Sequence, residues 1–396
     1  MNSQLKTATE SPIATESAMC ESMCLPWLWP VFAFERIAAA NPLQAMGEQF
    51  TEDSLRVSSD FLKFVEEAHK LDYELKPIWA TLNTTKLDLK TMLLRNFSET
   101  CEQKIPVIID APYSGHSATI ADFAADQSVV RTFKKNGLGR VYVTDWKSAT
   151  DAMKDFSIDT YLEDIDTAVD AVGGKVHLIG LSQGGWMSAA YAARFPGKVA
   201  TLVIAGAPID CDAGVGVVKN LVQTLPINFY RQLVAAGGGR LLGRFMLAAW
   251  KNMHPTDEYL KKYTDLFYNI NDKDYIKRAE EFARWYEAPM DLPGVYYLQA
   301  IEWLFQQNRL AKGKFVALGK KLSLKDITVP VYMLAGEADD ITPAAQVFDA
   351  EKYLGTPQNK MIKKLVPGGH IGLFMSHKTL HDTWPEICKW ILSYDV

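Results

Sequence analysis

Residues 176–186 read Val-His-Leu-Ile-Gly-Leu-Ser-Gln-Gly-Gly-Trp. This stretch opens with an apolar run, which is typical of a strand buried in a parallel sheet. It then makes a G-x-S-x-G turn, Gly180 to Gly184, and enters the helix-forming residues 186–193. A nucleophilic serine at Ser182 needs this strand–turn–helix order, since the N-terminus of the helix favours developing negative charge. An ordinary glycine-rich turn is the alternative, and the flanking strand and helix argue against it.

The segments around this turn alternate between strands and helices. Apolar runs predict strands at 104–110, 141–146, 200–206, 329–336 and 361–366, and helical spacing predicts helices at 119–135, 158–172 and 384–391. Residues 50–72 have the pattern of an amphipathic helix that covers the core, and residues 87–97 that of early antiparallel strands. The alternation predicts a mostly parallel, doubly wound sheet with helices on both faces, which is the α/β-hydrolase fold.

The alternation stops between residues 212 and 321, where the chain is helical and rich in aromatic residues. An insertion at this place in such a sheet is expected to form a cap over the active site. The predicted organisation is therefore an N-terminal segment (1–99) with a helix and early strands packing on the core, a discontinuous core (100–211 and 322–396), and the cap (212–321). Most of the cap aromatics are expected to form the cap's own core.

Composition narrows the possible functions. The chain has 396 residues, a net charge of −5 and 48% hydrophobic residues, so nothing indicates binding to nucleic acid. Its five cysteines (20, 24, 101, 211 and 388) form no disulfide or zinc pattern and are predicted to be free thiols in a reducing compartment. We expect no secretory signal and no membrane span. The apolar run from Met23 to Ala40 is expected either to pack on the body of the protein or to adsorb to an apolar surface.

A serine nucleophile needs a base and an orienting acid, which follow in the order Ser, acid, His in this fold. Asp339 comes just after the strand at 329–336, and His370 just after the strand at 361–366. The sequence predicts the triad Ser182, Asp339 and His370. Asp340 and Asp210 are alternative acids.

Two backbone N–H groups are expected to form the oxyanion hole. They are predicted to come from Gln183, which follows the nucleophile, and from Tyr113 in the loop after the strand at 104–110. Ser114, His116 and Trp186 are predicted to contact the substrate.

No metal or cofactor is implied. His377 and His381 are four residues apart on an expected helix, but no adjacent glutamate completes a zinc-binding pattern.

Several motifs resemble those of a known group of enzymes. Three segments look like those of the intracellular poly(3-hydroxybutyrate) depolymerases: 110–116 (Asp-Ala-Pro-Tyr-Ser-Gly-His), 142–146 (Tyr-Val-Thr-Asp-Trp) and 207–210 (Ala-Pro-Ile-Asp). Three others look like those of the related polyhydroxyalkanoate synthases: 308–310 (Asn-Arg-Leu) with 313–314 (Gly-Lys), 337–343 (Glu-Ala-Asp-Asp-Ile-Thr-Pro) and 369–371 (Gly-His-Ile). The resemblance runs from about residue 104 to the end. It implies that Asp339 is the acid and His370 the general base.

This chain departs from the resemblance at the nucleophile. The synthases, and the depolymerases nearest to the Ser-Gly-His loop, use cysteine, whereas this chain has Ser182. A serine ester attacked by water suits hydrolysis better than transfer between coenzyme A and a polymer. The prediction is a serine esterase that hydrolyses intracellular polyhydroxyalkanoate, specifically poly(3-hydroxybutyrate), through an acyl-enzyme on Ser182.

Three alternatives remain: a polyhydroxyalkanoate synthase or similar acyltransferase, a general carboxylesterase, and a non-enzymatic granule-coat protein with a degenerate hydrolase fold. The implied partner is a polyester granule or a hydroxyacid ester. The implied location is the cytoplasm, at the polymer granules if the substrate is stored polyester, and a homodimer is left open.

Overall fold

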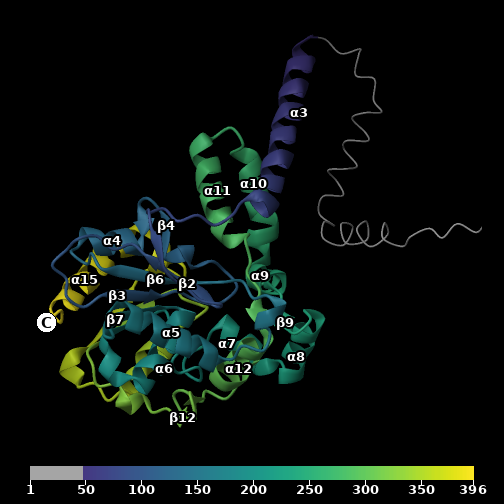
Figure 1. Ribbon diagram of the computed structural model, residues 1–396. Helices are drawn as coiled ribbons and strands as arrows, with labels where there is room; N and C mark the ends of the chain where they lie inside the picture. Colours follow the sequence, from purple (N-terminus) through teal and green to yellow (C-terminus); the bar gives the residue numbers. More distant parts are fainter. Residues whose placement is uncertain (1–47) are drawn as a thin grey trace, which may run out of the picture. The chain divides into compact units, whose positions relative to one another are not determined.

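The computed structural model describes residues 48–396, with side chains from Val57 onward (Figure 1). The chain divides into two units, 1–61 and 62–396, and the features below belong to the larger one. The first described helix, α3 (Glu48–His69), crosses the boundary between them. The predictions for the apolar segment 23–40 and for Cys20 and Cys24 lie outside the described residues. Cys101, Cys211 and Cys388 are free thiols.

An eight-stranded sheet forms the centre of the larger unit. Its strands, in spatial order, are β1 (Thr84–Asp88), β2 (Met92–Asn96), β6 (Val141–Trp146), β3 (Val107–Asp110), β7 (Val176–Leu181), β8 (Val199–Ala205), β13 (Val331–Gly336) and β14 (Met361–Val366). β1 and β2 are antiparallel to their neighbours, and all other pairs are parallel. The strand order reverses between β3 and β7, so the loops that follow these two strands face a crevice at the carboxyl edge of the sheet.

Helices cover both faces of the sheet, as predicted (Figure 1). The helices α5 (Ile158–Val172) and α6 (Gln183–Arg194) pack on one face, where one buried apolar cluster lies. The helices α4 (Val129–Lys135) and α15 (Trp384–Leu392) pack on the other face with a second cluster. Two short helices, α13 (Ala344–Phe348) and α14 (Gly372–Met375), follow β13 and β14. This arrangement is the α/β-hydrolase fold.

The predicted helix at 119–135 is wrong in its first half. Residues 118–121 form a 3₁₀ turn, and β4 (Asp122–Ala124) pairs with β5 (Gln127–Ser128) before α4 begins. The buried carboxylate of Asp122 accepts hydrogen bonds from Thr81 and Ser128, which fixes the hairpin. Ser128 then caps α4, because its hydroxyl accepts the N–H of Arg131 at 2.9 Å.

The inserted segment joins β8 to β13 and is mostly helical, in agreement with its sequence pattern. Its helices are α7 (Val217–Thr224), α8 (Ile227–Ala236), α9 (Gly243–Lys251), α10 (Lys262–Tyr268), α11 (Lys273–Tyr286) and α12 (Gly294–Gln299), with short pairs β9/β10 (Arg240–Leu241, Leu292–Pro293) and β11/β12 (Val316–Ala317, Lys320–Lys321). The ring of Phe64, on α3, packs edge-on against Phe267 of α10 at 5.6 Å. This part of α3 therefore contacts the inserted helices, whereas we expected the helix to cover the core.

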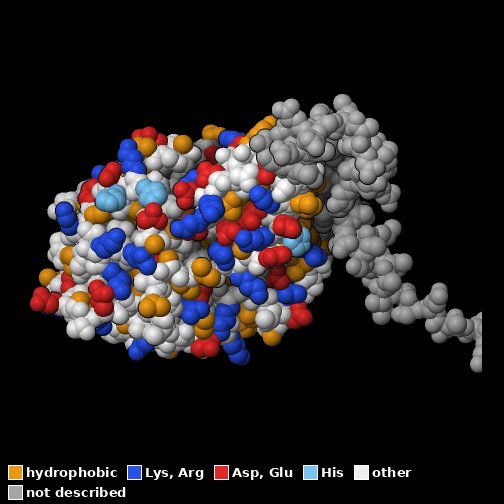
Figure 2. Space-filling view, turned by 90° about the horizontal axis from the view of Figure 1, so that it is seen from above, with side chains coloured by type: hydrophobic (Ala, Val, Ile, Leu, Met, Phe, Trp, Pro, Cys, Tyr) orange, Lys and Arg blue, Asp and Glu red, His pale blue; other side chains and the backbone are white. Residues whose placement is uncertain are grey.

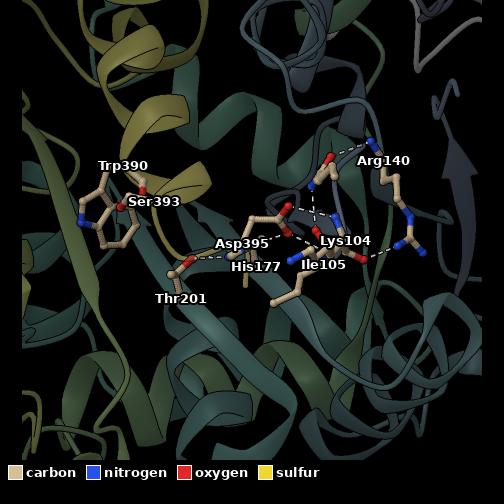
Figure 3. Close-up of polar contacts among 9 residues, drawn as sticks. Lys104, Ile105, Arg140, His177, Thr201, Trp390, Ser393 and Asp395 are labelled. Carbon is tan, nitrogen blue, oxygen red and sulfur yellow. Dashed lines mark hydrogen bonds and ion pairs between the residues drawn. The ribbon is translucent and has the colours of Figure 1, made fainter. Parts of the chain in front are cut away.

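The C-terminus is fixed at the amino edge of the sheet, opposite the crevice. The carboxylate of Asp395 accepts the N–H groups of Lys104 and Ile105 at 2.9 and 2.7 Å (Figure 3). It also lies 3.7 Å from Nε2 of His177, whose Nδ1 lies 2.9 Å from the Thr201 hydroxyl. Burial lowers the pKa of His177 to about 4, so this imidazole is neutral and has a structural role.

Acidic and basic side chains are interspersed on the face drawn in Figure 2. Among the described helices, none is both long enough and apolar enough to cross a membrane.

Candidate active site

Ser182 lies at the turn between β7 and α6 in a strained backbone conformation, with φ 49° and ψ −119°. Only three non-glycine residues of the described chain have positive φ, so the geometry is unusual here. The turn is held by two hydrogen bonds, from Ser182 N–H to the Ala205 carbonyl and from Gly185 N–H to the Ser182 carbonyl, both 2.8 Å long. Strain that is held this firmly is typical of a functional residue.

Glycines allow the backbone to pass this closely. A Cβ at Gly184 would overlap the carbonyl oxygen of Asp110, and one at Gly180 would overlap the Cα of Gly185. Because the obstructing atoms are backbone in both cases, no side-chain movement relieves the clash. The glycines of the G-x-S-x-G turn are therefore steric requirements for packing α6 against β3 and β7.

The structure brings Ser182, His370 and Asp339 together from three separate loops. Nε2 of His370 lies 2.8 Å from the Ser182 hydroxyl, and Nδ1 of His370 lies 2.7 Å from Oδ2 of Asp339. All three residues are buried. With Asp339 ionised, Nδ1–H donates to the carboxylate and Nε2 accepts from the serine hydroxyl, which is the arrangement that activates a serine.

The geometry distinguishes Asp339 from the two alternative acids. The second oxygen of Asp339, Oδ1, accepts the N–H groups of Ile341 and Thr342 at 3.1 and 2.7 Å, so its carboxylate is held in one orientation. Asp340 is half-exposed and pairs with His254 at 3.2 Å. Asp210 is buried and accepts hydrogen bonds from other side chains, so the structure joins neither alternative to His370.

A cavity of about 340 Å³ opens above Ser182 and His370. The core contributes Pro112, Ser114 and His116 from the loop after β3, and Ile341, Thr342, Gly369 and Ile371 from the acid and histidine loops. The inserted segment contributes Val218, Trp250, Met253, His254, Glu258, Phe282, Trp285, Tyr286 and Phe305. Five aromatic residues of the insertion thus line the cavity. The spacing of the aromatic residues in the sequence did not show which of them would do so.

Ser114 and His116, which the sequence predicted to contact the substrate, both line this cavity. His116 is buried, its Nε2 lies 3.0 Å from the carbonyl oxygen of Tyr286, and its ring stacks on that of Tyr286 at 5.3 Å. Burial lowers its pKa to about 4, so the imidazole is neutral and donates to that carbonyl. Trp285 donates to the carbonyl of Ser117 at 3.0 Å, so α11 is tied to the same loop.

The two predicted oxyanion donors are placed differently. Gln183 is the first residue of α6 and lines the cavity. The side chain of Tyr113 is buried in the core, where its hydroxyl donates to the Lys147 carbonyl at 3.0 Å. Its neighbours Pro112 and Ser114 line the cavity, so only the backbone of Tyr113 remains a candidate for the site.

Trp186 does not line this cavity, so the prediction that its side chain contacts the substrate is wrong. Its side chain is fully buried, and its indole N–H donates to Oε1 of Gln183. The two residues are one helical turn apart on α6, which brings the indole beside the glutamine side chain. Trp186 therefore positions Gln183 from within the core.

A buried carboxyl group lies beneath the G-x-S-x-G turn. Asp110, the last residue of β3, accepts the Thr144 hydroxyl at 3.1 Å and lies 3.2 Å from the Ser188 hydroxyl. Burial raises the pKa of Asp110 to about 8, because the effect of burial is larger than that of the hydrogen bonds, which lower the pKa. The group is therefore protonated at neutral pH and joins β3, β6 and α6 beneath Ser182.

No group of three or more histidine, cysteine or carboxylate side chains in the described residues is arranged to hold a metal ion. His377 lies 3.7 Å from Asp126 on the surface.

Comparison with known proteins places the chain in a family. Residues 43–392 match the family described as "Protein of unknown function (DUF3141)", and the chain belongs to that family. It is 28% identical over 290 residues to a protein named Poly(3-hydroxyalkanoate) polymerase subunit PhaC from Haloferax mediterranei, covering 72% of this chain and 56% of that protein. The chain thus spans little more than half the length of this relative.

Another protein of the same name, from Synechocystis, is 24% identical over 365 residues, which is 87% of this chain and 93% of that protein. Among solved structures, the monoacylglycerol lipase of Paleococcus ferrophilus superposes with a TM-score of 0.51 at 17% identity, covering 76% of this chain and 99% of the lipase. The lipase supports the fold. Both sequence relatives are named as subunits of poly(3-hydroxyalkanoate) polymerases, to which this chain is similar.

Proposed function

We propose that this protein is a serine-dependent ester hydrolase that acts on polyhydroxyalkanoate or on oligomers of its hydroxyacids. The observation that carries the proposal is the continuous hydrogen-bonded series Ser182–His370–Asp339 at the base of a largely apolar cavity. The strained conformation of Ser182 supports it, because such strain persists where a nucleophile must be presented.

The proposed reaction runs through an acyl-enzyme. Ser182 Oγ attacks the ester carbonyl while Nε2 of His370 takes its proton, and Asp339 stabilises the imidazolium. The N–H of Gln183, at the N-terminus of α6, and the N–H of Tyr113 hold the oxyanion. The alcohol leaves with the proton from His370, and water then releases the acid by the same steps in reverse order.

The substrate class is inferred from the relatives and from the cavity. The matched relatives are named poly(3-hydroxyalkanoate) polymerases, so a hydroxyalkanoate ester is the favoured substrate. The aromatic walls at Trp250, Phe282 and Phe305 suit an aliphatic ester chain. The carboxylates of Glu258 and Asp340 also line the cavity and disfavour a substrate with a free carboxylate near them.

A polymer synthase is the second candidate, and the names of the relatives favour it. The nucleophile argues for hydrolysis. An oxygen ester at Ser182 has a lower acyl-transfer potential than a thioester, so passing the acyl group to another hydroxyl is close to neutral and water in excess competes well.

One preparation tests both candidates. The protein is incubated with amorphous poly(3-hydroxybutyrate) and, separately, with 3-hydroxybutyryl-coenzyme A, and the release of acid and of free thiol is followed. We expect 3-hydroxybutyrate or short oligomers from the polymer, and no polymer from the thioester. The Ser182→Ala variant is the control for the release of acid and for the release of free thiol.

The opposite pattern overturns the proposal. Thiol release with insoluble polymer accumulating, and no acid from the polymer, would identify a synthase. Ser182→Cys adds a second comparison, because a synthase site should make more polymer with a thiol nucleophile, whereas a hydrolase site should not.

A further inference from the structure

A second cavity lies next to the catalytic one. It has a volume of about 220 Å³ and lies among α10, α11 and the π-helical turn that follows α3 (Lys70–Glu74). Its apolar lining includes Leu71, Leu266, Tyr275, Ala279 and Ala283. None of these five side chains lines the catalytic cavity, so the second cavity is a separate space between the inserted helices and the turn at Lys70–Glu74.

Three residues line both cavities: Glu258, Phe282 and Tyr286. They therefore form the partition between the two spaces. Phe282 and Tyr286 lie one turn apart on α11, and their rings stack at 5.2 Å. Removing one ring from this partition would connect the second cavity with the space above Ser182.

The two rings of the partition are held differently. Tyr286 is stacked on His116, whose imidazole donates to the Tyr286 carbonyl, so it is fixed to the loop beside the nucleophile. Phe282 ends this series of stacked rings and is 41% exposed. Truncation of Phe282 therefore opens the partition while leaving the contact with the catalytic loop in place.

The charges around the second cavity indicate what it accepts. Lys262 is hydrogen bonded to Glu287 and Asp72, so it is not available to pair with a substrate carboxylate. Asp257 and Glu258 also line the space and would repel a carboxylate. A neutral aliphatic chain is the ligand that fits this lining.

We propose that Phe282 sets the upper limit of chain length by separating the catalytic cavity from an apolar extension that can accept the acyl chain of a longer ester. The inference rests on the proposed serine hydrolase function. It assigns to the second cavity a role in selecting substrates.

The test measures covalent modification of Ser182 by p-nitrophenyl alkylphosphonates with butyl or decyl chains. Ser182 Oγ bonds to phosphorus, p-nitrophenolate leaves, and His370 takes the serine proton. The mass of the intact protein reports the adduct, and released p-nitrophenolate reports the rate. The ratio of the decyl to the butyl rate constant is compared between variants.

Phe282→Ala is expected to raise this ratio about tenfold or more, since even one methylene in an apolar pocket changes selectivity by that order. Adding Ala279→Phe, which fills the second cavity from a position outside the catalytic one, should return the ratio toward that of the unmodified protein. Phe229→Ala is the matched control, because Phe229 is 40% exposed and lines neither of these two cavities. Phe282→Leu serves as a milder variant.

The two hypotheses fail in different ways. If the butyl reagent modifies Ser182 but neither Phe282 variant changes the ratio, the role of Phe282 is overturned and the hydrolase proposal stands. A gain that persists after Ala279→Phe would also overturn it, because the chain would then lie elsewhere. If no reagent modifies Ser182 in the unmodified protein, the proposed function fails, and this inference fails with it.

Discussion

Nδ2 of Asn308 donates a 2.7 Å hydrogen bond to Oδ1 of Asp210, and the two residues are 98 positions apart. Asp210 follows β8 at the start of the inserted segment, and Asn308 lies near its end. Oδ1 of Asn308 accepts the N–H of Cys211 at 3.1 Å, and the Tyr353 hydroxyl donates to Oδ2 of Asp210. The ends of the insertion are thus joined to each other and to the core. Two of the sequence motifs that resemble the polyester enzymes meet here.

Loss of this bond should destabilise the protein. Asn308 has φ 49°, which glycine tolerates, so Asn308→Gly removes the amide without adding strain. We expect the free energy of unfolding to fall by about 1–3 kcal/mol, because the buried Asp210 carboxylate loses a partner. Urea denaturation measures the change. Gln307→Gly, at the exposed neighbouring position, controls for the added chain entropy. An equal loss in both variants would contradict the prediction.

The assignment of Asp339 as the acid of the proposed triad can be tested against its neighbour Asp340. Asp339→Asn should lower kcat toward an activated ester by about 10⁴-fold, because the amide no longer fixes the tautomer of His370. Asp340→Asn should have little effect, because Asp340 is half-exposed and pairs with His254. Ser182→Ala and His370→Ala should each abolish nearly all turnover in a folded protein. If Asp340→Asn were the inactive variant, the assignment of the acid would be wrong.

The glycines of the G-x-S-x-G turn should not tolerate even a methyl group. Gly184→Ala places a Cβ against the backbone carbonyl of Asp110, so α6 must move away from β3. We expect a loss of about 3 kcal/mol in the free energy of unfolding together with loss of activity. Gly197→Ala is the control, because a Cβ there meets nothing within 4 Å. Thermal unfolding followed by circular dichroism compares the two, and similar melting temperatures would refute the steric argument.

Asp110 should make stability depend on pH in an unusual direction. The pKa of its carboxyl is raised from the ordinary aspartate value of 3.8 to about 8 in the folded protein, because the group is buried. Between about pH 4 and pH 8 the folded state keeps a proton that the unfolded chain has released, so this group's contribution to stability falls as pH rises. Above about pH 8 the group is ionised in both states, and the dependence ends.

Asp110→Asn isolates this contribution. Asparagine has the shape of the protonated acid and keeps a carbonyl for the Thr144 hydroxyl, so the variant should lose the downward slope between about pH 5 and pH 8. The neutral histidines His116 and His177, each with a pKa lowered to about 4, act in the opposite direction below about pH 6.5. The contribution of Asp110 is therefore given only by the difference in the pH dependence of stability between the unmodified protein and the Asp110→Asn variant. Parallel denaturation curves at each pH would measure it, and identical slopes would contradict the prediction.

Local sequence predicted those features that depend on short-range pattern. The strand, the glycine turn and the helix around Ser182 follow from apolar runs and from the steric needs of Gly180 and Gly184. The boundaries of α5 follow from helical spacing and from the stop at Gly173, which has φ 135°. The helix predicted at 119–135 failed because Asp122 forms hydrogen bonds with Thr81, a residue far away in sequence, and those bonds favour a hairpin.

The sequence by itself determined the order of the elements and the α/β-hydrolase fold, and it predicted that Ser182 and His370 meet, because each follows a recognisable strand. Only the tertiary structure decided which acid faces His370, since Asp339 and Asp340 are adjacent and differ in orientation alone. It also decided that Trp186 packs inside the core and that five aromatic residues of the insertion line the cavity. Side-chain direction on irregular loops and packed helices depends on contacts between distant segments, and no local pattern encodes those contacts.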